Sequence, residues 1–153
     1  MTTVGGSPVP KRLTHLALRV RDLDRAVEFY SQVLGLTVQS HSPRAAFLSA
    51  RGETSHDLAL FGLGADAPGP EDNRVGMYHM AWEMESFDDL QGLYWHLLKK
   101  NATIAGFSDS ATASSVSFFD PDRNEIEAIY ELPSDQWPKE RVPGAKFPRQ
   151  LQR

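Results

Sequence analysis

Residues 13–20 read LTHLALRV, and 64 positions further along the chain residues 77–84 read MYHMAWEM. In both stretches large apolar residues occupy every second position, which is the pattern of a β-strand with one buried face. Each stretch carries a histidine at the same place, His15 in the first and His79 in the second. An internal repeat constrains the whole fold, because both copies are expected to form the same structure.

The repeat continues through a helix and three further strands in each copy. Between Asp22, a helix-capping residue, and Gly35, which marks a helix end, apolar residues recur at helical spacing. The same spacing returns 64 positions later. Short strand-like stretches follow at 36–39, 45–49 and 57–61 in the first copy, and near 103, at 116–119 and at 125–130 in the second. We predict an α+β fold in which two paired βαβββ modules form a half-open barrel.

Changes in composition set the expected boundaries. They are a disordered lead-in at 1–11, a first module at 12–62, a linker at 63–75, a second module at 76–131 and a proline-rich C-terminal arm at 132–153. Prolines at this density prevent a helix in the arm. The arm is predicted to be either a solvated tail or an extended segment that docks through Trp137 and Phe147 on its own domain or on a partner chain.

Composition excludes several classes of protein. The chain has 153 residues, 41% of them hydrophobic, which suits one soluble domain or two small modules sharing a core. It has no cysteine, so disulfides and thiolate metal sites are excluded. A net charge of −4 without a basic run argues against nucleic acid and membrane surfaces as partners. Because no apolar run is long enough to cross a bilayer and no signal peptide is apparent, we expect a cytoplasmic protein.

The two histidines of the repeat are candidate metal ligands. Both lie on the strand face opposite the large apolar side chains, and therefore opposite the helix of each module. The last strand offers a carboxylate, since Glu125 and Glu127 share one face. Two neutral imidazoles and one carboxylate form a ligand set that leaves positions on a divalent ion open to substrate or oxygen. Spacing alone makes either glutamate a candidate.

Two longer motifs open and close the repeat. The first reads LTHLAL at 13–18, DLDRAVEFY at 22–30 and VLGL at 33–36, and the second reads FFDPDRNEIE at 118–127. Together they resemble the vicinal oxygen chelate superfamily, which includes glyoxalases, bleomycin-resistance proteins and extradiol dioxygenases. The resemblance implies that His15, His79 and Glu127 are the metal ligands. Arg123 departs from the family, which usually has glycine in this turn.

Within this superfamily, residues 47–61 resemble type I extradiol dioxygenases most. In the stretch 47–61, the resemblance implies that His56 is an active-site acid/base, a role for which an imidazole is suited near neutral pH. Strict alternation from Ala59 would instead aim His56 at the opposite face, so a surface turn is the alternative. The tyrosine and the histidine that extradiol enzymes usually carry are missing at Ser117 and near Ser108.

Family membership does not fix the reaction. Glyoxalases carry a fourth ligand where alignment of the two modules places Ala59, and thiol transferases carry a basic residue that is absent around Gln136. A glyoxalase-like isomerase, a thiol transferase and a metal-free drug-binding protein remain the alternatives to a dioxygenase. The resemblance also implies a small-molecule substrate with vicinal oxygens, a divalent metal, and a homodimer that in some members completes the site across two chains. Fe(II) is favoured, with Mn, Zn and Ni as alternatives.

Overall fold

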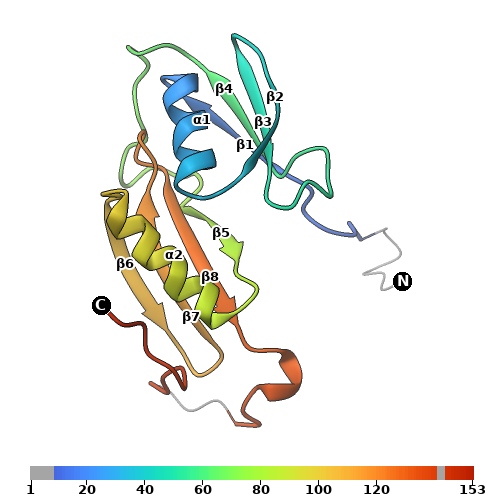
Figure 1. Ribbon diagram of the computed structural model, residues 1–153, viewed down its shortest axis with the longest axis vertical. Coiled ribbons are helices and arrows are strands. Elements are labelled where there is room, and N and C mark those ends of the chain that lie inside the picture. The colour runs from blue at the N-terminus through green and yellow to red at the C-terminus, as the bar shows by residue number, and fades with distance from the viewer. Residues whose placement is uncertain (1–8, 141–143) are drawn as a thin grey trace.

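The computed structural model describes residues 9–140 and 144–153. Most of the predicted lead-in, residues 1–8, and residues 141–143 of the arm lie outside this range. The elements, in chain order, are β1 (Leu16–Val20), α1 (Leu23–Gln32), β2 (Thr37–His41), β3 (Ala45–Ser49), β4 (Leu58–Gly62), β5 (His79–Glu83), α2 (Phe87–Lys99), β6 (Ile104–Asp109), β7 (Ala113–Phe119), β8 (Glu125–Glu131) and a 3₁₀ turn (Ser134–Gln136). The predicted order βαβββ therefore occurs twice, with the first module above the second in Figure 1.

Each module forms its own four-stranded mixed sheet. The strand orders are β1-β4-β3-β2 and β5-β8-β7-β6, with the first pair parallel and the others antiparallel. The register repeats as well, because Ala17 lies opposite Ala59 in the first sheet and Ala81 lies opposite Glu127 in the second. The α+β fold of paired modules is thus confirmed, and Ala59 holds the position in the first module that Glu127 holds in the second.

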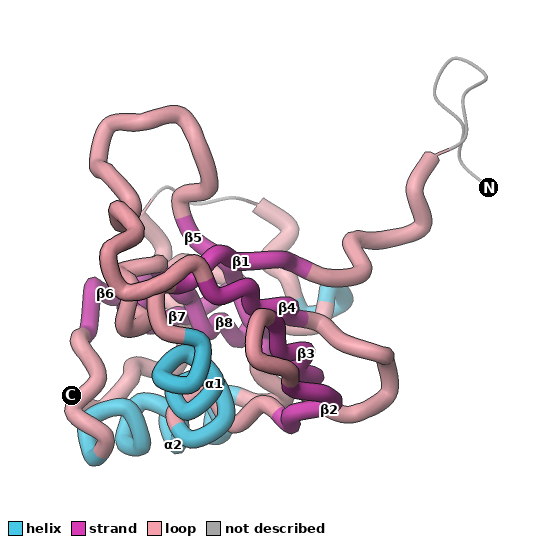
Figure 2. The backbone as a smooth tube through the Cα atoms, turned by 90° about the horizontal axis from the view of Figure 1, so that it is seen from above, coloured by secondary structure: helices cyan, strands magenta, loops and turns pink. Residues whose placement is uncertain are grey.

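Side-chain caps start both helices. The Asp22 carboxylate accepts a hydrogen bond from the Arg25 backbone N–H at 3.0 Å, and the Ser86 hydroxyl accepts one from that of Asp89 at 3.1 Å. Both helices lie on the same side of the strands in Figure 2. Apolar residues of both modules, such as Leu60 and Leu90, form one buried cluster beneath them. The opposite face of each sheet carries no helix, and we call it the helix-free face.

Within the described ranges, no helix is both long enough and apolar enough to span a membrane.

Arg123 occupies the fourth position of the tight turn between β7 and β8, which begins at Asp120. Its φ of 69° lies in the left-handed region that favours glycine. The turn closes nevertheless, because the Arg123 N–H donates to the Asp120 carbonyl at 3.0 Å. The guanidinium lies 5.9 Å from the centre of the Phe119 ring. The departure from the usual glycine therefore leaves the turn intact.

The C-terminal arm docks on the second module. Phe147 is only 4% exposed, and its ring stacks on Phe87 at 5.4 Å. The guanidinium of Arg149 lies 4.3 Å above the Phe87 ring. Trp137, by contrast, stays 44% exposed and donates its indole N–H to the Leu132 carbonyl. Of the two aromatic anchors predicted for the arm, Phe147 is the one that is buried on its own domain.

Phe147→Ala should therefore lower the free energy of unfolding by about 3 kcal/mol, because it removes a buried ring and leaves a cavity. Trp137→Ala is the matched control, and its exposed side chain should contribute less than about 1 kcal/mol. Urea denaturation of the two variants measures both effects. A loss in Phe147→Ala as small as the loss expected for Trp137→Ala would show that the arm does not belong to the core of the second module.

Candidate functional site

The helix-free face of the second sheet brings His79 and Glu127 together. Because β5 pairs with β8, the His79 Nε2 atom lies 3.2 Å from Glu127 Oε2. On the next strand, the Ser115 hydroxyl donates to Glu127 Oε1 at 2.5 Å and so orients the carboxylate. His79 Nδ1 is buried and has no hydrogen-bond partner among the described residues. One imidazole and one oriented carboxylate thus supply two of the three predicted ligands.

Ser115 was not predicted as a site residue, although the alternation of side chains along β7 indicates its position. Ser115 and Ser117 alternate with the buried residues Val116 and Phe118 along β7. This alternation places both hydroxyls on the helix-free face. Ser115 is 1% exposed, which leaves its hydroxyl in need of a partner, and Glu127 is that partner.

The first module places His15 beside His56. The two imidazole centres lie 4.5 Å apart, and the ring of Phe47 lies 5.0 Å from that of His56. The alternation argument that aimed His56 at the other face does not apply, because β4 begins only at Leu58. His56 belongs to the loop before the strand, and the loop turns its ring toward the helix-free face. Both rings also lie near a neighbouring hydroxyl, with Thr14 Oγ1 3.0 Å from His15 Nδ1 and Ser55 Oγ 3.1 Å from His56 Nδ1.

Asp57 shapes the loop that carries His56. Its carboxylate accepts hydrogen bonds from the Ala50 N–H at 2.8 Å and from the hydroxyls of Ser49 and Thr54 at 3.0 and 2.9 Å. Partial burial by itself would raise the pKa of Asp57, but these hydrogen bonds and the nearby His56 outweigh it and hold the pKa below its usual value. The charged form of Asp57 therefore stabilises the loop.

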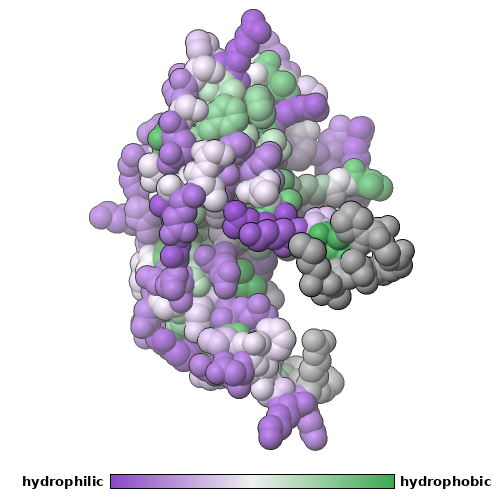
Figure 3. Space-filling model, turned by 90° about the vertical axis from the view of Figure 1, so that its right-hand side faces the viewer, coloured by the Kyte–Doolittle hydropathy of each residue, from purple (hydrophilic) through white to green (hydrophobic). Residues whose placement is uncertain are grey.

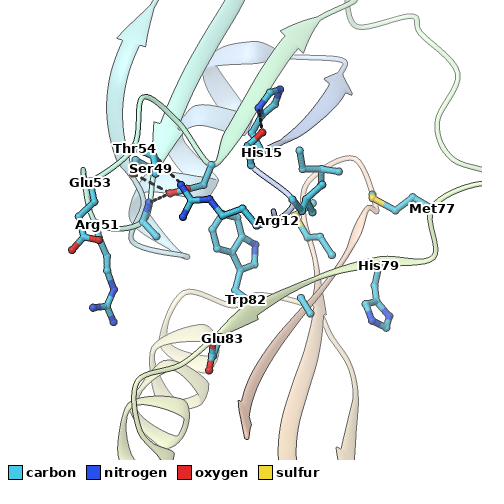
Figure 4. A pocket seen from close by; sticks show the side chains of 17 residues that line it. Arg12, His15, Ser49, Arg51, Glu53, Thr54, Met77, His79, Trp82 and Glu83 are labelled. Carbon is cyan, nitrogen blue, oxygen red and sulfur yellow. Dashed lines mark hydrogen bonds between the residues drawn. The ribbon is translucent and has the colours of Figure 1, made fainter. Parts of the chain in front are cut away.

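The third predicted ligand, His15, does not meet the other two within one chain. A cavity of about 730 Å³ lies between the modules, and its lining includes both His15 and His79. Figure 4 shows their rings pointing away from each other, with His15 on the first module and His79 on the second. Within residues 9–140 and 144–153, no group of three or more His, Asp or Glu side chains is placed to hold a metal ion. The metal-ligand assignment therefore stays a prediction.

The helix-free face of the first module also exposes apolar side chains. Phe61 is 41% exposed, and its ring lies 6.2 Å from that of Phe47. Apolar surface is visible on the upper part of the molecule in Figure 3, which views the right-hand side of Figure 1. Aromatic rings thus accompany the imidazoles of the first module, whereas the second module contributes the carboxylate.

A match to a protein-family model shows which family the chain belongs to. The model described as "Glyoxalase/Bleomycin resistance protein/Dioxygenase superfamily" matches residues 12–128. The chain belongs to this superfamily. The match includes both modules and all four predicted site residues, His15, His56, His79 and Glu127.

Two relatives of this chain are named as dioxygenases. Catechol-2,3-dioxygenase of Bacillus subtilis (strain 168) is 30% identical over 131 residues, which cover 84% of this chain and 45% of that protein. Biphenyl-2,3-diol 1,2-dioxygenase 3 of Rhodococcus globerulus is 31% identical over 120 residues, which cover 78% of this chain and 63% of that protein. The chain thus spans about half the length of the curated relatives it matches.

Solved structures of the superfamily show the same fold. The crystal structure of a glyoxalase/dioxygenase from Nostoc punctiforme superposes with a TM-score of 0.68 at 22% sequence identity, covering 86% of this chain and all of the other. At this identity the likeness shows the fold and does not define the reaction.

Asp57→Asn should lower the free energy of unfolding by about 1–2 kcal/mol at pH 7, because a charged acceptor of three hydrogen bonds is lost. Because the pKa of Asp57 in the folded protein is lowered, its stabilisation is complete above the ordinary pKa of an aspartate, 3.8, and disappears as the pH falls through the folded pKa. The difference between variant and wild type should accordingly shrink in acid. Thermal unfolding between pH 7 and pH 3 measures it, with Asp66→Asn on the exposed linker as control. A difference that grew in acid would contradict this assignment.

Proposed function

We propose that the protein is a divalent-metal-dependent enzyme that acts on a small substrate with vicinal oxygens, most like an extradiol ring-cleaving dioxygenase. The contact between His79 and Glu127 on the helix-free face carries the proposal, since it supplies an imidazole and a carboxylate within 3.2 Å. The relatives named for catechol and biphenyl-2,3-diol support the substrate class, because both names denote aromatic rings with neighbouring hydroxyls.

His15, His79 and Glu127 would hold the metal. The two imidazoles and the carboxylate suit a divalent ion that keeps open coordination positions. The Ser115 hydroxyl orients the Glu127 carboxylate through a hydrogen bond, as is common for side chains next to metal ligands. Fe(II) is the favoured ion, with Mn, Zn and Ni as alternatives. When bound, the metal would act as a Lewis acid toward the substrate oxygens and, as Fe(II), would support reaction with O₂.

A second copy of the chain would complete each site. His15 of one copy would join His79 and Glu127 of the other, which accounts for the separation of the two halves within one chain. A two-fold dimer forms two identical sites in this way, because each copy presents its first module to the partner's second module.

Charge and exposed apolar surface both favour this pairing. Arg19 lies on the same strand face as His15, whereas Glu83 and Glu125 lie with His79 and Glu127, so the two helix-free faces are complementary in charge. Leu13, two residues before His15, and Tyr78, directly before His79, are 84% and 78% exposed. Large apolar side chains at this exposure are suited to burial against a partner.

His56 is the proposed proton carrier. The Ser55 hydroxyl near Nδ1 engages that nitrogen, which leaves Nε2 to take a proton from a substrate hydroxyl and to return it later in the reaction. Phe47 contacts the His56 ring and lies near Phe61. These two rings would form an apolar wall against the substrate ring and exclude water from it.

His56→Gln should reduce kcat by about 10²–10⁴-fold and leave metal content unchanged, because a positioned acid/base is lost while the ligands remain. Oxygen uptake with catechol and 2,3-dihydroxybiphenyl, after anaerobic loading with Fe(II), measures turnover. His41→Gln is the control, since His41 pairs with Asp24 on the exposed surface. If the loaded wild type consumes no oxygen with either diol, the dioxygenase proposal is wrong.

Mixing two inactive variants tests the shared site directly. His15→Ala and His79→Ala should each abolish metal binding. Refolding them together should recover about a quarter of the wild-type metal capacity, because half of the dimers are mixed and each mixed dimer has one intact site. Metal analysis after gel filtration measures the recovery. A site contained within one chain would recover nothing.

A further inference from the structure

We propose that Tyr30 is a positioning residue for the metal centre. Through the turn between β7 and β8, its hydroxyl fixes where Glu127 lies relative to the first module. This inference rests on the proposed function, because a dimer with two shared sites works only if the angle between the modules of each chain suits both sites at once. Tyr30 lies on α1 and belongs to the face opposite the histidines.

A buried hydrogen bond joins Tyr30 to the turn. Its hydroxyl donates to Asp120 Oδ2 at 2.9 Å, and the two residues are 0% and 5% exposed. The other oxygen of Asp120 accepts the backbone N–H groups of Asp122 and Asn124 at 2.9 and 2.8 Å. The same carboxylate therefore both shapes the turn and attaches it to the helix of the first module.

Arg21 makes a second connection to the same turn. Asp122 accepts hydrogen bonds from the Arg21 backbone N–H at 3.1 Å and from its guanidinium at 3.0 Å. The guanidinium also donates to the Ala67 carbonyl at 2.6 Å and so holds the linker between the modules. Three separate segments thus meet at the turn, and we call this set of contacts the module clamp.

The module clamp connects directly to both halves of the site. Asn124 precedes β8, on which Glu127 is the third residue, and Arg21 follows β1, which His15 precedes. A paired strand is a stiff element, so a rotation at the turn displaces Glu127 as a unit with β8. The clamp therefore sets the relation between the carboxylate and the imidazole of the first module.

The internal repeat provides a comparison for Tyr30. Tyr94 occupies the equivalent place on α2 and is likewise buried, at 6% exposure. Its ring packs against Phe107 at 5.4 Å, but no hydrogen bond joins its hydroxyl to a carboxylate in the part of the chain that the structure describes. Both tyrosines fill the core, and only Tyr30 links the modules.

The Tyr30 hydroxyl stays protonated near neutral pH. Burial, together with the neighbouring Asp120 carboxylate, raises the pKa of Tyr30 far above its usual value. The Tyr30 hydroxyl consequently remains a proton donor near neutral pH.

Cobalt binding to Tyr30→Phe and Tyr94→Phe tests the inference. The affinity for Co(II), measured by competition with a chromophoric chelator, should fall about tenfold in Tyr30→Phe, the size of effect seen when outer partners of metal ligands are lost. Its visible absorption spectrum should also change, because the coordination geometry is altered. Tyr94→Phe should keep wild-type affinity and spectrum. Both variants are compared as dimers at a temperature at which both are folded.

Each outcome decides one question. If wild-type protein binds no Co(II), the proposed function is overturned. If the wild type binds and both tyrosine variants match it, the positioning role of Tyr30 is overturned while the proposed function stands. If Tyr30→Phe does not fold, Asp120→Asn replaces it, because this change removes the charged acceptor of the same hydroxyl bond. An unchanged affinity and spectrum in that variant would equally overturn the inference.

Discussion

The arrangement of this molecule depends on one buried carboxylate. Asp120 is 5% exposed, and a charge at that depth must be met by donors. Those donors come from its own turn, from Asn124 and from Tyr30 on the other module. Meeting this requirement holds the first helix against the turn of the second module, where both modules share one hydrophobic core. The relation between the modules therefore rests on this polar contact between residues 90 apart in sequence and on the apolar core that the modules share.

This arrangement explains why the chemistry lies in two places. Both helices pack on one side of the strands, so the helix-free faces look outward (Figure 2). His79 contacts Glu127, and His15 contacts His56. The two pairs lie apart, and no metal site of three side chains forms among the described residues of one chain. Under the proposed function a second copy closes this separation, and the module clamp determines whether two sites can form together.

The position of His56 shows how loop structure changes a prediction from pattern. Side-chain alternation is reliable only inside a strand, where pleating fixes direction. The strand begins two residues later, at Leu58, and hydrogen bonds to Asp57 shape the loop instead. The imidazole therefore shares a face with His15, which strict alternation did not predict.

The sequence by itself determined the modules, the strands and the faces of their side chains, because periodicity and an internal repeat are local properties. It placed His15, His79 and Glu127 on helix-free faces for the same reason. The separation of His15 from His79, the hydroxyl of Ser115 on Glu127 and the burial of Phe147 depended on the tertiary structure. These features arise from how distant segments satisfy buried polar groups and pack apolar ones, and no local pattern specifies which distant segment supplies the partner.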